Sequence, residues 1–546
     1  MKTYTEEKRI RPHILTTAVY WSVIIMMLYN IISVRIFGDK GSGYCSGPLT
    51  LYFLLYVSFV LAVQKAVYIM VRLRARRSQF LNAEANMTRS FKLFVVIGIL
   101  LGIILMLCSF VIARGLFGAS KIYLHFIMIG ISLMFLCPQG VIRGYLQGLG
   151  YTRPIMICDM IIAVTSFVTG AIISGILYSY GKKVNALFHG DEYSAIYGAS
   201  GMIIGVLIGS IVGFVQINIS MALRRKEIAD IVKNGAPRYL DNKNDVLTGL
   251  RSILYLYASP VLMCLADNIF YYVYHIKADD AEEMIGLYGA FSGRIVSFMI
   301  LMAFLCCIPF VKSWNRVMAR IERDELEGSR ARLKGLLHFG AMLLVPVTIF
   351  LFTAGKEIQI AIFGKYSNLI DGMPQIAAIA MFALAIAIFV SWLLNHMGKS
   401  ILVYVSLTIG WIVHIFMMIL WVLILKRDLM GIMIAQLISF AVYDVFCFYM
   451  IFKMLRYKQK VLKKLGLPIL AAAVAGLLLM FFNRILVDRI GEVLTLILGA
   501  LMFTIVYMLV LIVIRGVKTE ELERIPMGRL FITFSHAVQH DNYYED

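Results

Sequence analysis

The stretch LYGAFSGRIVSFMILMAFLCCIPFV, from Leu287 to Val311, decides the fold class of this chain. It is long enough to cross a bilayer as a helix, which takes about 20 apolar residues, yet it carries Arg294 well inside. A charge at that depth is costly when it faces lipid, so Arg294 should face a partner such as Asp267 or a water-filled cavity. Two interpretations stay open: an arginine that serves packing or snorkels outward, and a cationic binding point inside a cleft.

Apolar segments of this kind recur along the whole chain. The 546 residues are 60% hydrophobic and 15% charged, and the mean hydropathy is +0.82. The pattern predicts about fourteen membrane-spanning helices and leaves no soluble domain of enzyme size. We therefore expect an all-α polytopic membrane protein with two pseudo-symmetric six-helix bundles and a C-terminal helix pair.

The formal net charge of +20 would suggest a nucleic-acid partner in a soluble protein. Here most of the 52 lysines and arginines fall in alternate connections between the apolar segments, which is the positive-inside pattern. We expect both termini in the cytoplasm and anionic inner-leaflet lipids as partners of the basic loops. No nucleic-acid partner is expected.

Cysteine spacing and short motifs give little sign of a cofactor. The eight cysteines form no C-x-x-C pair, and most lie in apolar segments, so neither a metal site nor a disulfide framework is expected. The chain lacks a nucleotide-binding P-loop, so it should not hydrolyse ATP itself. The segment 14–37 is too long for a signal-peptide core, and we interpret it as an uncleaved first span.

The longest polar connection, from Arg224 to Asp245, falls near the middle of the chain. Its first part can form a short amphipathic helix, with Ile228, Ile231 and Val232 on one face. On either side of this linker, three short matches recur at a nearly constant offset: Gly43-Tyr44 with Leu287-Tyr288, Arg72 with Arg316, and Leu116-Phe117-Gly118 with Ile362-Phe363-Gly364.

These matches indicate duplicated lobes in the same orientation, which is typical of transporters with a substrate site between the halves. The predicted divisions are an N-terminal lobe (1–222), a cytoplasmic linker (223–249), a C-terminal lobe (250–465), an extra helix pair (466–514) and a cytoplasmic tail (515–546).

A glycine-rich motif follows the fourth predicted span: RGYLQGLGYTRP, from Arg143 to Pro154. Gly144, Gly148 and Gly150 permit a tight turn and close helix approach, and Pro154 can begin the next helix. The motif resembles a cytoplasmic turn of the multidrug/oligosaccharidyl-lipid/polysaccharide (MOP) exporter superfamily, in its polysaccharide-transport, stage V sporulation protein B and lipid II flippase branches. The segments 34–44 and 287–294 resemble the first external loop and the eighth-helix entry of the same branches.

This resemblance implies two bundles around a V-shaped cavity lined by helices one, two, seven and eight, with the extra C-terminal pair forming a groove toward lipid. It implies a bacterial plasma-membrane flippase for undecaprenyl-pyrophosphate-linked saccharides, such as a peptidoglycan precursor or a polysaccharide repeat unit. Cell-envelope synthesis proteins would be its partners. Lipid II flippases of the best-known type carry arginines on the first helix where this chain has Val23 and Tyr29, whereas Arg294 matches their eighth-helix arginine.

A flippase for such lipids needs fixed positive charge for the diphosphate. Arg294 and Lys65 supply one cation in each predicted lobe and are the expected headgroup contacts, although Lys65 lies close enough to the inner boundary to snorkel. Gln64 could bind sugar or link helices. Arg35 could be a ligand contact, but it ends the first span and suits an interfacial anchor better.

Asp267 and Asn268 lie near the middle of the seventh predicted span. The carboxylate could balance Arg294, or it could take up the proton or sodium ion that drives transport. Charge balance is the favoured interpretation, and no other cofactor is expected.

Three other functions remain as alternatives. A cation-coupled drug antiporter of the same superfamily would use carboxylates such as Asp267, and it would lack the final helix pair. A polytopic glycosyl- or acyltransferase would need external carboxylates or a catalytic histidine, and His414 stands in no suitable motif. In a non-transporting scaffold, Arg294 and Asp267 would serve packing alone.

Overall fold

The computed structural model describes residues 12–236, 245–275, 281–321, 326–456, 461–517 and 532. These residues are mostly helical and contain no strand, so the predicted all-α polytopic class is confirmed. Among them, 13 helices are long and apolar enough to cross a membrane. The first, Ile14–Arg76, has 63 residues, enough for two crossings of about 30 Å at about 1.5 Å per residue. The number of spans thus agrees with the predicted fourteen.

By packing, the chain divides into two compact units. The first comprises Met1–Ile308 and Val403–Ile432, and the second comprises Pro309–Leu402 and Met433–Asp546. This division follows contacts, whereas the lobes predicted from the sequence follow internal symmetry. The lobe boundaries stay a prediction, and much of the predicted tail, like residues 237–244 of the predicted linker, lies outside the described residues.

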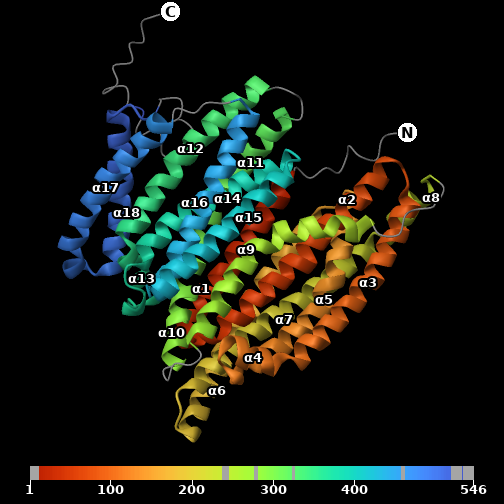
Figure 1. The fold of residues 1–546 in the computed structure, drawn as a ribbon, viewed down its shortest axis with the longest axis horizontal. Coiled ribbons are helices and arrows are strands. Elements are labelled where there is room, and N and C mark those ends of the chain that lie inside the picture. The colour runs from red at the N-terminus through yellow and green to blue at the C-terminus, as the bar shows by residue number, and fades with distance from the viewer. Residues whose placement is uncertain are drawn as a thin grey trace, which may run out of the picture. The chain divides into compact units, whose positions relative to one another are not determined.

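The first unit is built from long helices that run side by side: α5 packs against α2, α3 and α7, and α6 packs against α1 and α7 (Figure 1). Three short segments of this unit, η1, η3 and η5, are π-helices. Its elements are α1 (Pro12–Leu55), η1 (Tyr56–Ala62), α2 (Val63–Arg76), α3 (Phe80–Leu107), α4 (Ser109–Phe117), η2 (Ser120–Ile122), α5 (Tyr123–Gly148), α6 (Arg153–Phe188), α7 (Glu192–Leu223), α8 (Arg225–Lys233), α9 (Asp245–His275), α10 (Ala281–Ala290) and η3 (Phe291–Val296). It also holds the first part of α11 (Ser297–Ile321), most of α15 (Ser400–Met418), η5 (Ile419–Ile424) and the start of α16 (Asp428–Met454).

The second unit holds the rest of α11 and α16 together with α12 (Leu326–Thr353), α13 (Gly355–Phe363), η4 (Asn368–Ile370), α14 (Met373–His396), α17 (Val461–Ile490) and α18 (Glu492–Val513). The last two helices pack against each other and against α12. Tyr507 donates a hydrogen bond from its hydroxyl to the Met342 carbonyl oxygen at 3.0 Å, and Asn483 donates one to Glu357 at 3.0 Å. The predicted helix pair 466–514 is therefore a hairpin tied to α12 and α13.

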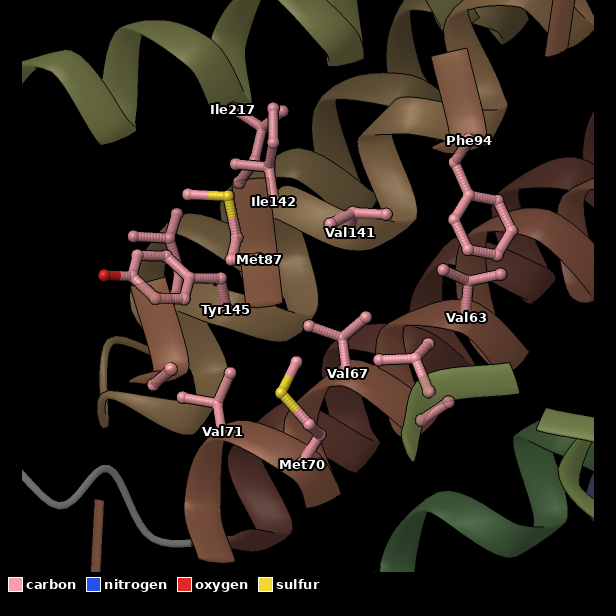
Figure 2. Packing of buried hydrophobic residues seen from close by; sticks show 14 of the residues in the cluster. Val63, Val67, Met70, Val71, Met87, Phe94, Val141, Ile142, Tyr145 and Ile217 are labelled. Atoms are coloured by element: carbon pink, nitrogen blue, oxygen red, sulfur yellow. The ribbon is translucent and has the colours of Figure 1, made fainter. Parts of the chain in front are cut away.

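An apolar cluster holds α2, α3, α5 and α7 together, and ten of its side chains are labelled in Figure 2. They belong to α2 (Val63, Val67, Met70, Val71), α3 (Met87, Phe94), α5 (Val141, Ile142, Tyr145) and α7 (Ile217). The short helix α8 joins the same cluster through Ile228 and Val232, which are 5% and 7% exposed. The amphipathic helix predicted in the linker is thus confirmed, and its apolar face packs against protein.

Glycines let α5 approach the second span closely. A Cβ atom added at Gly140 would overlap the Phe59 carbonyl oxygen, and one added at Gly144 would lie 2.6 Å from both the Gln64 carbonyl oxygen and Val67 Cβ. The helix ends at Gly148, and Gly150 follows with a φ of 99°, a conformation that favours glycine. Pro154 then lies in the first turn of α6.

Substitution of Gly144 by alanine tests this close packing. We expect Gly144→Ala to lower the stability of the detergent-solubilised protein by about 1 to 3 kcal/mol, because the methyl group overpacks the interface with α2. Gly115→Ala is the matched control, since a Cβ atom there has no neighbour within 4 Å. The temperature at which monodisperse elution is lost measures both, and equal temperatures for the two variants would contradict the packing argument.

Candidate functional site

Arg294 lies in the π-helix η3 and is only 3% exposed. Its Nε donates to Oδ1 of Asp39 at 2.6 Å, and its Nη2 donates to Oδ2 of the same carboxylate at 3.1 Å. Two parallel bonds between a guanidinium and a carboxylate form the strong bidentate arrangement of an ion pair. The guanidinium of Arg294 therefore faces the Asp39 carboxylate.

The backbone around Asp39 is shaped for this pairing. Gly38, with a φ of 76°, interrupts the long first helix, and Asp39 follows directly after this break. A Cβ atom at Gly289 would overlap the Asp39 carbonyl oxygen, and one at Gly43 would overlap the Ile285 carbonyl oxygen. Only glycine fits at these two positions, so α1 and α10 meet backbone to backbone beside the ion pair.

Further contacts extend the junction along α1. Asn30 donates a hydrogen bond to Ser297 at the start of α11, and the Tyr20 and Phe304 rings pack edge to face with centroids 5.0 Å apart. These two contacts lie ten residues apart on α1, so they connect this helix to α11 at separate points beyond the ion pair.

The helix α9 closes the junction from another direction. Tyr272 donates from its hydroxyl to the Gly43 carbonyl oxygen at 3.1 Å, and Asn268 donates from Nδ2 to Ser46 Oγ at 3.3 Å. The candidate site is therefore a closed junction of the first, second, seventh and eighth spans. These are the spans that the family resemblance assigns to a cavity lining.

Asp267, the neighbour of Asn268, points to a different helix. Its Oδ1 lies 2.6 Å from Nε2 of His414 on α15, and the two residues are 1% and 2% exposed. The bidentate carboxylate on Arg294 is Asp39, while Asp267 bonds to His414, and charge balance between Asp267 and Arg294 stays a prediction. Asn268 Oδ1 is buried without a hydrogen-bond partner among the described residues.

A second buried ion pair lies between α5 and α6. Arg143 is fully buried, and its Nη2 donates to Asp159 Oδ1. Its Nε donates to Gln64 Oε1 at 2.7 Å, and the Tyr56 hydroxyl donates to the same Asp159 oxygen at 2.9 Å. Arg143, which the sequence predicts in a cytoplasmic turn, is thus a buried residue of α5. Its long side chain reaches the Asp159 carboxylate on the next helix.

The other predicted cations do not join the junction in the part of the chain that the structure describes. Lys65 is partly buried on α2, with Nζ 5.4 Å from the centroid of the Tyr68 ring. Arg35 is exposed on α1. Gln64 belongs to the Arg143 cluster and also donates to Gln147 at 2.8 Å. Of the four predicted substrate contacts, only Arg294 lies in the junction.

Comparison with known proteins gives no match by sequence: no protein-family model matches the chain, and no curated protein matches it. Solved structures do match its fold. The inward closed conformation of the lipid II flippase MurJ has a TM-score of 0.59 at 14% identity, covering 91% of this chain and 97% of that one.

Two other matches are transporters of the MOP superfamily. An inward-facing multidrug resistance MATE family transporter has a TM-score of 0.57 at 14% identity, covering 81% of this chain and 99% of that one. A MOP superfamily transporter from Pyrococcus furiosus has a TM-score of 0.52 at 13% identity, covering 83% of this chain and all of that one. The chain thus has the fold of MOP-superfamily transporters, as its motifs indicated.

A double-mutant cycle tests the strength of the Asp39–Arg294 pair. We expect Asp39→Ala to destabilise the protein by about 3 to 5 kcal/mol, because it removes the bidentate carboxylate from a buried arginine. Arg294→Ala should cost less, since the Asp39 side chain is 18% exposed and can be hydrated. The double variant should be less destabilised than the sum of the two, by about 1 to 3 kcal/mol.

Denaturation by increasing fractions of SDS in mixed micelles measures these free energies of unfolding. The exposed pair Lys121–Glu192, with side chains 48% and 20% exposed, is the matched control, and its coupling should be below about 1 kcal/mol. Strictly additive effects at Asp39 and Arg294 would contradict the proposed strength of the pair.

Proposed function

We propose that this protein is a flippase that moves an undecaprenyl-pyrophosphate-linked saccharide from the inner to the outer leaflet by alternating access. The observation that carries the proposal is Arg294, a bidentate arginine held within a membrane-spanning segment at the junction of four spans. Intramembrane charges are expensive and usually mark a substrate or ion pathway. A fold shared with transporters supports a transport role for this one.

The diphosphate suits Arg294 because a guanidinium can donate to two phosphate oxygens at once. Lys65 remains a proposed second contact, as a point charge on α2. Gln64 is engaged by Arg143, so we assign it a supporting role, and the exposed Arg35 fits an interfacial anchor. The polyprenyl tail would remain in lipid throughout.

A cation-coupled drug antiporter is the second candidate, since MATE transporters share the fold. The C-terminal helix pair favours the flippase. The MurJ match covers about a tenth more of this chain than the MATE match does, and that share is close to the combined length of α17 and α18. The pairing of Asp39 with Arg294 also argues against a cation-binding cavity at the junction, because an arginine already balances this carboxylate.

For energy coupling we propose the Asp267–His414 pair. A carboxylate and an imidazole in hydrogen-bond contact inside the membrane can share and exchange a proton. Because Asn268 bonds to Ser46, a shift of α9 on protonation would reach the junction directly.

The proposed location is the plasma membrane of a bacterial cell, with both termini in the cytoplasm. The exposed residues Arg76, Arg77, Arg225 and Lys226 fit contact with anionic inner-leaflet lipids. Envelope-synthesis proteins that make or use the lipid-linked saccharide are the proposed functional partners.

The role of Arg294 can be tested in cells. Arg294→Ala should fail to complement a flippase-depleted strain at unchanged protein level, because the headgroup loses its cation. Arg294→Lys should complement weakly, since it keeps the charge without the bidentate geometry. The lipid-linked precursor that accumulates on the inner leaflet upon depletion identifies the cargo. Normal growth with Arg294→Ala, or no accumulating precursor, would remove the flippase proposal.

The coupling role of Asp267 can be tested in proteoliposomes. Flipping by the unaltered protein should respond to an imposed pH gradient, whereas Asp267→Asn and His414→Gln should each lose that response because the shared proton site is gone. A sodium gradient serves as the comparison. A pH response that survives in Asp267→Asn would rule this pair out as the coupling site.

A further inference from the structure

The two side chains of the Asp39–Arg294 pair differ in their access to water. Arg294 is 3% exposed and lies in the first third of the candidate span Glu283–Ile321, so its charge has little access to water. The Asp39 side chain is 18% exposed and directly follows Gly38, the break in the first helix. The carboxylate can therefore turn toward water through rotation at the break, while the guanidinium cannot.

Asp39 occupies the donors that a phosphate group would need. Its two carboxylate oxygens accept hydrogen bonds from Nε and Nη2 of Arg294, and these two nitrogens form one edge of the planar guanidinium. Carboxylate and phosphate bind this edge with the same bidentate geometry. Both anions cannot use it together, so binding of one at this edge excludes the other.

Release of Asp39 would loosen the junction beside it. The carbonyl oxygen of Asp39 lies against Gly289, and Ser42, in the next turn, lies against Gly293 of η3. Ser42 is only 2% exposed, and its hydroxyl has no hydrogen-bond partner among the described residues. The packing of α1 on α10 and η3 at this point therefore depends on close backbone contact and on the ion pair.

We propose that the diphosphate of the cargo displaces Asp39 from Arg294, and that this exchange of one anion for another unlocks the junction of α1 with α10 and η3. Asp39 is then a positioning residue: it keeps Arg294 paired and the junction closed until cargo arrives. The inference rests on the proposed function, and it adds that cargo binding and opening are linked through a single guanidinium. A ligand that opens the junction must bind its open state more tightly than its closed state, and competition for Arg294 supplies that difference.

A cysteine reporter at Ser42 tests the exchange. In protein with Cys108 replaced by serine, because Cys108 is the exposed native cysteine among the described residues, Ser42→Cys should react slowly with a membrane-impermeant maleimide. Adding Asp39→Asn should speed the reaction by about tenfold or more, the factor expected when a hydrogen-bonded charge pair is lost. Ser174→Cys, on α6 and also buried, is the matched control and should stay slow in both proteins.

The ligand arm uses farnesyl diphosphate, an isoprenoid diphosphate, and farnesol, the same chain without phosphate. Farnesyl diphosphate should speed labelling of Ser42→Cys in the otherwise unaltered protein toward the rate of the Asp39→Asn variant, and farnesol should not. In the Arg294→Gln variant labelling should already be fast, and farnesyl diphosphate should change nothing. Inorganic pyrophosphate separates recognition of the diphosphate alone from recognition of the lipid.

Several results would overturn the exchange. Labelling that farnesyl diphosphate leaves unchanged or slows would show that the anion does not displace Asp39. If the labelling rate of Ser174→Cys rose together with that of Ser42→Cys, the cause would be general unfolding and not release of Asp39. If labelling contradicts the exchange but flipping still requires Arg294, the exchange is wrong and the flippase proposal stands. If the protein flips no lipid at all, the proposed function itself is wrong.

Discussion

A permanent positive charge buried within a membrane-spanning segment is the constraint on which the candidate site depends. Arg294 is 3% exposed in η3, and a buried cation of this kind needs an anion from the fold. The anion comes from the break at Gly38, and glycines at positions 43 and 289 let the two backbones approach closely enough for the bond. The helix break, the close approach and the ion pair are three parts of one solution.

The same principle recurs in the first unit with different residues. Arg143 forms an ion pair with Asp159, and His414 is hydrogen-bonded to Asp267, and all four side chains are buried. Each cluster lies in or beside a π-helix: Tyr56 begins η1, Arg294 lies in η3, and His414 precedes η5 by just over one turn. A π-helix inserts an extra residue into a turn and is often found at functional sites, because it re-aims side chains without ending the helix. We infer that these segments place polar side chains inside apolar spans.

Hydropathy and an isolated charge are local signals, so the sequence predicts the spans and singles out Arg294 as a candidate site residue. The partners are harder to predict, because Asp39 lies 255 residues from Arg294 in the chain and no local pattern connects the two. The glycines after Arg143 predict a turn, whereas α5 continues to Gly148 and buries Arg143. Pairing of distant charges depends on tertiary packing, which residue patterns in one sequence do not encode.

The central claim is that a diphosphate is recognised at Arg294, and transport of matched lipids tests it most directly. Proteoliposomes would carry the same fluorescent saccharide linked to undecaprenol through either a diphosphate or a monophosphate, with appearance in the opposite leaflet as the signal. The account predicts rapid, Arg294-dependent movement of the diphosphate-linked lipid and much slower movement of the monophosphate-linked one. Equal rates for the two lipids, or equal rates with Arg294→Ala, would contradict it.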